Sequence, residues 1–266
     1  MVLQVSDISL GYPQQGQSQP ILEKVSFQVE AGKICCLLGA SGVGKSSLLR
    51  ILAGLDRALC GDVALAGSAI TAPHNDIGFV FQSPNLLPWL TVRQNVAFGL
   101  QLASAGNLSK QAINERVDAA LEEVGLQAVA NRLPRELSGG MAQRVNLART
   151  LARQPKLILL DEPFSALDPV IREQMQQLLQ QIVQHHHTAA VMITHDIDEA
   201  LNIAHDILLL GAQPDCPATL VGRWQLVSEF PRQNLRQLSE IRLDILQALQ
   251  RHQTRKQQEQ TIEFEI

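Results

Sequence analysis

The chain of 266 residues is 45% hydrophobic and 18% charged, and its formal net charge is -4. These values are typical of a soluble globular protein that buries a core of its own. The acidic balance gives no electrostatic reason to expect a nucleic-acid partner. No apolar run approaches the roughly 18–20 residues that cross a bilayer, and the first ten residues lack the pattern of a signal peptide.

The cysteines show no metal-ligand spacing, and we expect four reduced thiols in a cytosolic protein: Cys35, Cys36, Cys60 and Cys216. Cys35 and Cys36 are adjacent in an apolar run. In a strand, they should therefore point to opposite faces.

Short apolar runs separated by turns make up the first 82 residues. Residues 25–29 alternate with the period of a half-buried strand, whereas the continuous run 34–39 is typical of a strand buried on both faces. A glycine loop follows, and then apolar residues recur at helical spacing from Leu48 to Leu55. Residues 61–67 and 77–82 predict further strands.

Residues 83–155 differ, because they show helical patterns and no convincing strand. One apolar stripe runs from Ile113 to Val124, with Ser109 as the expected N-cap and Gly125 as the stop. We therefore expect a helical subdomain inserted into a sheet domain.

Strands resume from 156 to 215 and alternate with helices, which predicts a mainly parallel sheet covered on both faces. Asp168 and Pro169 are typical of a helix start. Residues 216–266 are expected to form a short helical tail without chemistry of its own.

The stretch "GASGVGKS" fits the phosphate-binding pattern G-x-x-x-x-G-K-[ST], with a buried strand before it and a helix after it. Its glycines let several backbone N–H groups aim at one anion, the lysine places a positive charge on the terminal phosphates, and the serine hydroxyl can bind Mg²⁺. The expected ATP-binding residues are Gly39, Ala40, Ser41, Gly42, Val43, Gly44, Lys45, Ser46 and Ser47.

Four side chains at strand ends complete the expected chemistry. Asp161 ends the run "LILLD" and should hold Mg²⁺ together with Ser46, while Glu162 should polarise the attacking water. His195 follows another strand and could contact the γ-phosphate, although a lone histidine there is also typical of an ordinary loop. Gln82, a weak signal by itself, could reach Mg²⁺ or the water.

A second glycine stretch, "LSGG", precedes a helix at Ser138, Gly139 and Gly140, where free N–H groups and a helix dipole favour phosphate. The helical insertion should keep it far from Lys45 of the same chain. Two chains arranged head to tail about a two-fold axis would bring the two loops to one γ-phosphate. Two ATP molecules would then be buried between the chains, and hydrolysis would let the chains part.

Taken in order, these motifs resemble the ATP-binding cassette (ABC) ATPase family over about residues 2–210. The resemblance implies an α/β P-loop NTPase with a mainly parallel core sheet, an N-terminal antiparallel β subdomain and an inserted α-helical subdomain. Its implied divisions are a RecA-like and antiparallel-β ATP-binding core (1–82 and 156–215), a helical signature subdomain (83–155) and the tail (216–266).

The resemblance also implies residue roles and cofactors. ATP and Mg²⁺ are the implied cofactors, with Tyr12 stacking on adenine, Glu162 as the catalytic carboxylate and His195 as a switch. The segment Ser165–Asp168 is implied to cross the interface of a homodimer. The family motif usually reads L-S-G-G-Q, and Met141 here replaces the glutamine, so any contact from that glutamine side chain is in doubt.

Residues 83–100 resemble the segment of bacterial importers on which a permease's cytoplasmic helix docks. The apolar residues Leu86, Leu87, Pro88 and Trp89 would otherwise form an exposed patch, or they pack inside the helical subdomain. The signature and short tail resemble the nitrate, sulfonate and taurine importer group. The implied partners are separate integral membrane permease subunits and, indirectly, an external solute-binding protein, with this chain peripheral at the cytoplasmic face of the inner membrane.

Two other classes remain open at this point, a soluble cassette ATPase that moves no solute and an exporter or lipid-trafficking ATPase. The run His185–His187 could suggest a metal site. Consecutive residues on a helix point about 100° apart, so we expect these histidines to diverge on a solvent-facing turn.

Overall fold

Two β-sheets of different kinds organise the chain. A computed structural model describes residues 1–14, 17–102, 108–213, 216–226, 232 and 235–252. A four-stranded antiparallel sheet has the order β2-β1-β4-β5, and a six-stranded sheet has the order β10-β9-β3-β8-β7-β6. The strands are β1 (Leu3–Gln14), β2 (Gln17–Val29), β3 (Ile34–Gly39), β4 (Cys60–Leu65), β5 (Ser68–Ala69), β6 (Ile77–Val80), β7 (Leu157–Asp161), β8 (Ala189–Ile193), β9 (Asp206–Gly211) and β10 (Thr219–Gln225).

The six-stranded sheet is parallel except at one edge, as the alternation of strands and helices predicts. Strand β3 pairs in parallel with both β8 and β9. Cys35 and Cys36 are adjacent residues of β3. Their side chains belong to two different hydrophobic clusters, one on each face of the sheet, which confirms that they point in opposite directions. Burial raises the pKa of both thiols.

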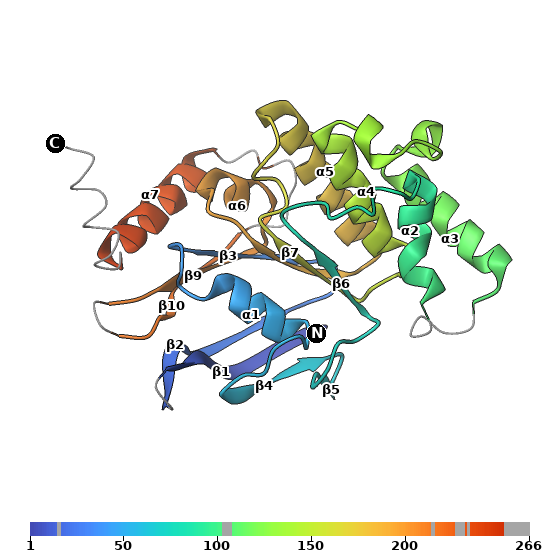
Figure 1. Cartoon of the computed structure of the whole chain (residues 1–266). Helices are drawn as coiled ribbons and strands as arrows, with labels where there is room; N and C mark the ends of the chain where they lie inside the picture. Colours follow the sequence, from blue (N-terminus) through green and yellow to red (C-terminus); the bar gives the residue numbers. More distant parts are fainter. Residues whose placement is uncertain (15–16, 103–107, 214–215, 227–231, 233–234, 253–266) are drawn as a thin grey trace.

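Helices cover both faces of this sheet (Figure 1). Helix α1 and the antiparallel sheet pack on one face, whereas α4, α5 and α6 pack on the other. The helices are α1 (Lys45–Leu52), α2 (Val92–Gln101), α3 (Lys110–Glu123), α4 (Gly139–Leu151), α5 (Pro169–His185), α6 (Ile197–Ile203) and α7 (Leu235–Arg251), with short 3₁₀ helices η2 (Gln127–Val129) and η3 (Pro134–Glu136).

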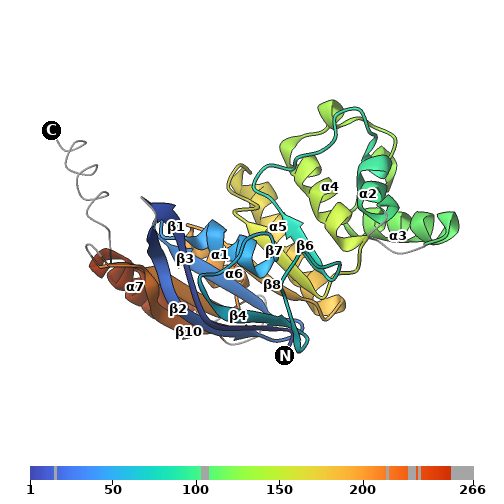
Figure 2. The same cartoon turned by 60° about the horizontal axis from the view of Figure 1, so that its bottom comes forward.

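Within the described part of 83–155 the chain forms helices and no strand. Figure 2 shows α2 and α3 grouped beyond the β6 edge of the six-stranded sheet, with α4 between them and the core. The expected boundaries of α3 are present: the Ser109 side chain accepts a hydrogen bond from the Ala112 N–H, and Gly125 adopts a φ of +68° after the helix.

The C-terminal part corrects one expectation. Residues 219–225 form β10, which extends the core sheet by pairing antiparallel to β9, so the sheet domain continues past residue 215. The helix expected in the tail is present as α7, and the Trp224 indole N–H on β10 donates to Asp244 Oδ2 on α7 over 2.7 Å. The sequence did not predict this antiparallel strand, because its hydrophobic pattern is weak and its residues are exposed or half-buried.

Among the helices of the described residues, none combines the length and apolar character that a bilayer crossing requires.

Candidate functional site

The loop between β3 and α1 has a backbone that requires glycine. Gly39, Gly42 and Gly44 all have positive φ values, of 151°, 81° and 101°. A Cβ on Gly39 would lie 2.4 Å from the Leu210 carbonyl oxygen, which no real side chain tolerates. The glycines predicted from the sequence therefore shape a loop whose N–H groups curl around the start of α1.

Lys45 is the first residue of α1, and it is only 8% exposed. Its ammonium group donates to the carbonyl oxygens of Gly39 and Ala40 over 2.7 and 2.9 Å. Burial lowers the pKa of Lys45, while the nearby carboxylates of Glu162 and Asp161 oppose this shift. The lysine is thus held at the floor of a pocket of about 340 Å³ whose lining also includes Ser41, Ser46, Ser47 and Glu162.

Ser46 and Asp161 meet at the mouth of the loop. The Ser46 hydroxyl donates to Asp161 Oδ1 over 3.2 Å, although 115 residues separate them in the chain. Burial raises the pKa of Asp161, and the hydrogen bond from Ser46 acts in the opposite direction. A hydroxyl and a carboxylate are hard oxygen donors of the type Mg²⁺ prefers, so these two side chains fit that ion.

Glu162 and His195 come from neighbouring parallel strands and touch. Glu162 follows β7 and His195 lies just beyond β8, and Glu162 Oε2 lies 3.1 Å from His195 Nδ1. Glu162 has a φ of 44°, which is uncommon for a residue with a side chain and is typical of a constrained functional position. The structure therefore brings together Glu162 and His195, two of the three residues that are predicted as catalytic; the third is Gln82.

Gln82 is tied to the same strand ends through Ser165. The Gln82 amide donates to Ser165 Oγ over 3.1 Å, and that hydroxyl donates to the Glu162 carbonyl oxygen over 3.1 Å. Asp168 is exposed and caps α5, since its Oδ1 accepts from the Ile171 N–H over 3.1 Å. The sequence places Ser165 at an interface, but it contains no signal for the link that Ser165 makes to Gln82.

The second glycine stretch lies apart from this pocket. Ser138 is exposed at the start of α4, where its hydroxyl accepts from the Met141 N–H over 3.3 Å. Helix α4 packs on the opposite face of the core sheet from α1, and residues 138–140 take no part in the lining of the phosphate pocket. The Met141 side chain is half-buried against the hydrophobic cluster under α4.

Tyr12 has its backbone in β1 opposite Gln19. Its side chain lies outside the described residues, so its expected contact with adenine stays a prediction.

A groove of about 620 Å³ lies where the helical part meets the core, and it is mostly apolar. The lining of this groove includes two arginines, Arg149 and Arg153. Its large apolar side chains are Leu55, Phe79, Phe81, Leu87 and Phe98. Trp89 is 71% exposed, whereas Leu86 is half-buried against the core. The segment 86–89 is therefore divided, with Leu86 packed inward and Trp89 projecting outward.

Two residues that the sequence reasoning missed hold this segment in place. Asn95 is fully buried, and its side chain accepts from the Leu87 N–H and donates to the carbonyl oxygens of Leu87, Leu90 and Thr91. Arg149 donates to the carbonyl oxygens of Pro84 and Asn85 over 3.0 Å each. A buried asparagine within an apolar helix face was the available sequence signal, but its partners are visible only in the structure.

Comparisons with known proteins find similar sequences over most of the chain. A sequence profile of the family described as ABC transporter matches residues 22–165. The aliphatic sulfonates import ATP-binding protein SsuB 1 of Xanthomonas axonopodis pv. citri is 45% identical over 87% of this chain and 91% of its own length. The nitrate import ATP-binding protein NrtD of a Synechocystis strain is 42% identical over 80% of this chain and 79% of its own.

Solved structures share the overall fold. The ATP-binding cassette MJ0796, in a dimeric post-hydrolysis state with ADP and phosphate, superposes with a TM-score of 0.72. That comparison covers 85% of this chain and 100% of the other, at 30% identity. CbiO1 of Clostridium perfringens, part of an ABC transporter complex, superposes with a TM-score of 0.73 at 25% identity, over 84% of this chain and 88% of the other.

Proposed function

This chain belongs to the ABC transporter family of ATPases, and we propose that it powers the import of a small nitrate-, sulfonate- or taurine-type solute. The proposed solute class is supported by two relatives that align over most of both chains. They are import ATP-binding proteins for aliphatic sulfonates and for nitrate. The chain is the ATP-hydrolysing subunit, so solute selection belongs to its partners.

Hydrolysis in this proposal depends on the touching pair at the strand ends. Glu162 accepts a proton from the attacking water, and His195, 3.1 Å away, orients that carboxylate and senses the γ-phosphate. Lys45 and the loop N–H groups bind the phosphates of ATP. Ser46, Asp161 and Gln82 would hold Mg²⁺, which neutralises phosphate charge when bound.

The site is completed by a second copy in this proposal. Dimeric cassette structures of the family support a homodimer. The positions of α1 and α4 on opposite faces of the sheet favour contact of Ser138, Gly139 and Gly140 with the ATP of the other copy, with Asp168 at the shared interface. ATP binding would then close two chains together, and hydrolysis would release them.

The exposed Trp89 and the apolar groove that includes Leu87, two residues earlier, are the proposed docking surface for a helix of an integral membrane permease. Asn95 and Arg149 hold the segment that borders this groove, so the surface exists before any partner arrives. A peripheral position at the cytoplasmic face of the inner membrane, and an indirect link to an external solute-binding protein, follow from this partnership.

Co-purification from membranes tests the proposal. We expect the tagged chain to retain an integral membrane permease, and Trp89→Ala to weaken that retention while leaving ATP affinity unchanged. Leu243→Ala is the matched control, because Leu243 is an exposed apolar side chain, 58% accessible, that lies on α7 and not in the segment 86–89. Normal ATP hydrolysis without any permease, or equal retention by Trp89→Ala and the control, would contradict the proposed importer partnership.

A further inference from the structure

We propose that Glu123, His185 and His186 form a binding site for a divalent transition-metal ion of the zinc type. The site lies outside the phosphate pocket and uses none of its residues. It is built from the C-terminal ends of two helices that belong to different parts of the chain.

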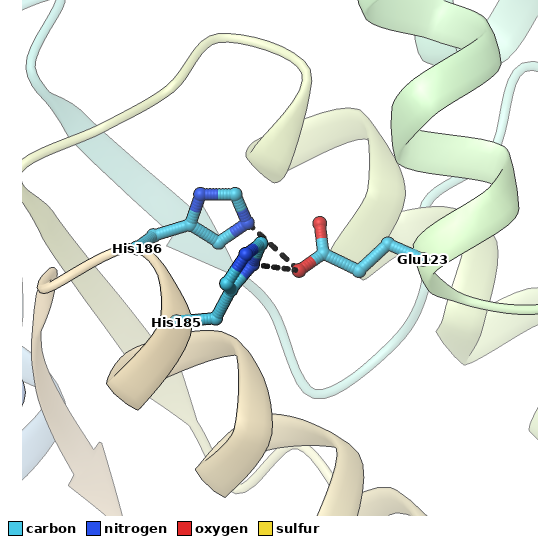
Figure 3. Close-up of side chains that lie close together, drawn as sticks. All are labelled: Glu123, His185 and His186. Carbon is cyan, nitrogen blue, oxygen red and sulfur yellow. Dashed lines mark hydrogen bonds and ion pairs between the residues drawn. The ribbon is translucent and has the colours of Figure 1, made fainter.

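The three side chains already point toward one another (Figure 3). Glu123 Oε1 lies 2.7 Å from His186 Nε2 and 3.8 Å from His185 Nδ1, and the three ligand atoms all lie within 4.8 Å of each other. In a tetrahedral zinc site with bonds of about 2.1 Å, ligand atoms are about 3.4 Å apart. The observed separations lie on both sides of that value, so small side-chain rotations bring all three to one ion.

The expectation that the three histidines diverge is wrong for two of them. His185 is the last residue of α5, His186 is its C-cap, and His187 leaves the helix with a φ of 49°. An imidazole extends well beyond its Cβ, so two adjacent rings at a helix end can turn toward one carboxylate. Their ring centroids are 4.8 Å apart at an interplanar angle of 63°.

The local electrostatics favour a cation. Glu123 is the last residue of α3 and His185 is the last residue of α5, so the negative dipole ends of two helices meet beside a carboxylate. The Glu123 side chain is 23% exposed, which shields this charge partly from water.

The donor set selects the class of metal. Two imidazole nitrogens and one carboxylate oxygen suit zinc, nickel or copper, whereas magnesium and calcium prefer oxygen donors alone. The His185 side chain is 79% exposed and that of His186 is 41% exposed, so water has access to a fourth coordination position.

Metal binding at this position would connect two parts of the molecule. Glu123 belongs to the helical part, and the two histidines belong to a helix that covers the core sheet. A ligand that binds only the folded chain raises its unfolding temperature. We therefore expect Zn²⁺ to raise the thermal midpoint of the protein.

The test is a Zn²⁺ titration of the full chain without a polyhistidine tag, in excess Mg²⁺, with a chromogenic chelator as competitor. We expect one tight equivalent per chain. Glu123→Gln and His185→Ala should each lower the affinity about tenfold or more, since even second-layer partners of metal ligands contribute that much. Glu122→Gln, an exposed carboxylate one residue away, should bind Zn²⁺ like the unmodified chain.

Thermal unfolding separates a metal site from an ion pair. The proposal predicts that the unmodified chain and Glu123→Gln respond differently to Zn²⁺, and that Co²⁺ shows the strong visible absorption of a four-coordinate ion only in the former. Equal Zn²⁺ affinity in Glu123→Gln and the unmodified chain would overturn it. A difference in thermal midpoint that is present without metal and unchanged by Zn²⁺ would also overturn it, showing only a His186–Glu123 ion pair.

Discussion

The two glycine-containing loops of this chain present phosphate-binding groups in opposite ways. The stretch Gly39–Ser47 spans the end of the buried strand β3, the glycine loop and the start of α1, with Lys45 turned into the protein and two carboxylates beside it. The stretch Ser138–Gly140 lies exposed at the start of α4, and its hydroxyl bonds only within its own helix turn.

This difference shows that two loops of similar local chemistry can differ in completeness. One forms a nearly complete phosphate site, and the other forms only part of one. The first loop has Lys45, the Ser46 hydroxyl and Glu162 within one pocket, and Asp161 accepts a hydrogen bond from Ser46. The second lies at the N-terminal end of a helix dipole, and its residues take no part in the lining of the phosphate pocket. In the proposed homodimer, a loop of the second kind gains a function when another copy supplies the nucleotide.

The largest expected effect tests the catalytic side of this comparison. Glu162→Gln keeps the shape of the side chain but removes the proton acceptor, so ATP hydrolysis should fall by about 100-fold or more. Binding of ATP should persist and a dimer should accumulate, as measured by phosphate release and light scattering. Glu122→Gln is the control, and a monomer with ATP bound to Glu162→Gln would contradict the shared site.

Lowering the pH should reduce the stability of the core sheet that supports the first loop. His205 is buried, and its Nδ1 accepts a hydrogen bond from the N–H of Ile34 at the start of β3. Burial lowers the pKa of His205 from 6.5 to about 4, and the positive charges of Lys33 and Arg232 act in the same direction. The unfolded chain then binds more protons between these values, so the free energy of unfolding should fall as pH drops from about 6.5 to 4, by at most about 3 kcal/mol.

Denaturant unfolding at several pH values measures this effect. His205→Asn retains an acceptor for the Ile34 N–H without an ionisable ring, so its stability should depend less on pH in that window. An identical pH dependence in the variant and the unmodified chain would exclude His205 as the cause.

A pair of cap substitutions tests the second loop. Ser138→Ala and Ser109→Ala each remove the N-cap of one helix, and each should cost about 1 kcal/mol of stability. Only Ser138→Ala should also lower ATP hydrolysis, by roughly tenfold to a hundredfold, because a hydrogen bond to a charged phosphate contributes about 1.5–3 kcal/mol. Equal hydrolysis in the two variants would remove Ser138 from the shared site.

The smallest expected effect concerns the unusual methionine after the second loop. Met141 packs against the cluster beneath α4, so Met141→Gln should cost about 1 kcal/mol of stability by half-burying an amide. Met141→Leu should be nearly neutral. Neither change should alter ATP-dependent dimerisation by light scattering, since the Met141 N–H that bonds Ser138 is retained; a loss of dimer in either would show that this side chain contributes to the interface.

The sequence alone determined most of the elements and the phosphate loop, because both depend on local rules. Buried apolar runs, helix caps at Ser109 and Asp168, and the spacing from Gly39 to Ser46 need no distant partner to be recognised. The parallel sheet followed from the alternation of strands and helices, and it placed Glu162 and His195 at the same edge.

Tertiary structure decided what depends on segments far apart in the chain. The strand β10 is stabilised by β9 and α7, the segment before Thr91 is held by Asn95 and Arg149, and two histidines of α5 meet Glu123 from α3. Each of these contacts depends on how helices and strands pack. Such packing is set by the summed burial of many side chains, and a short motif does not encode it.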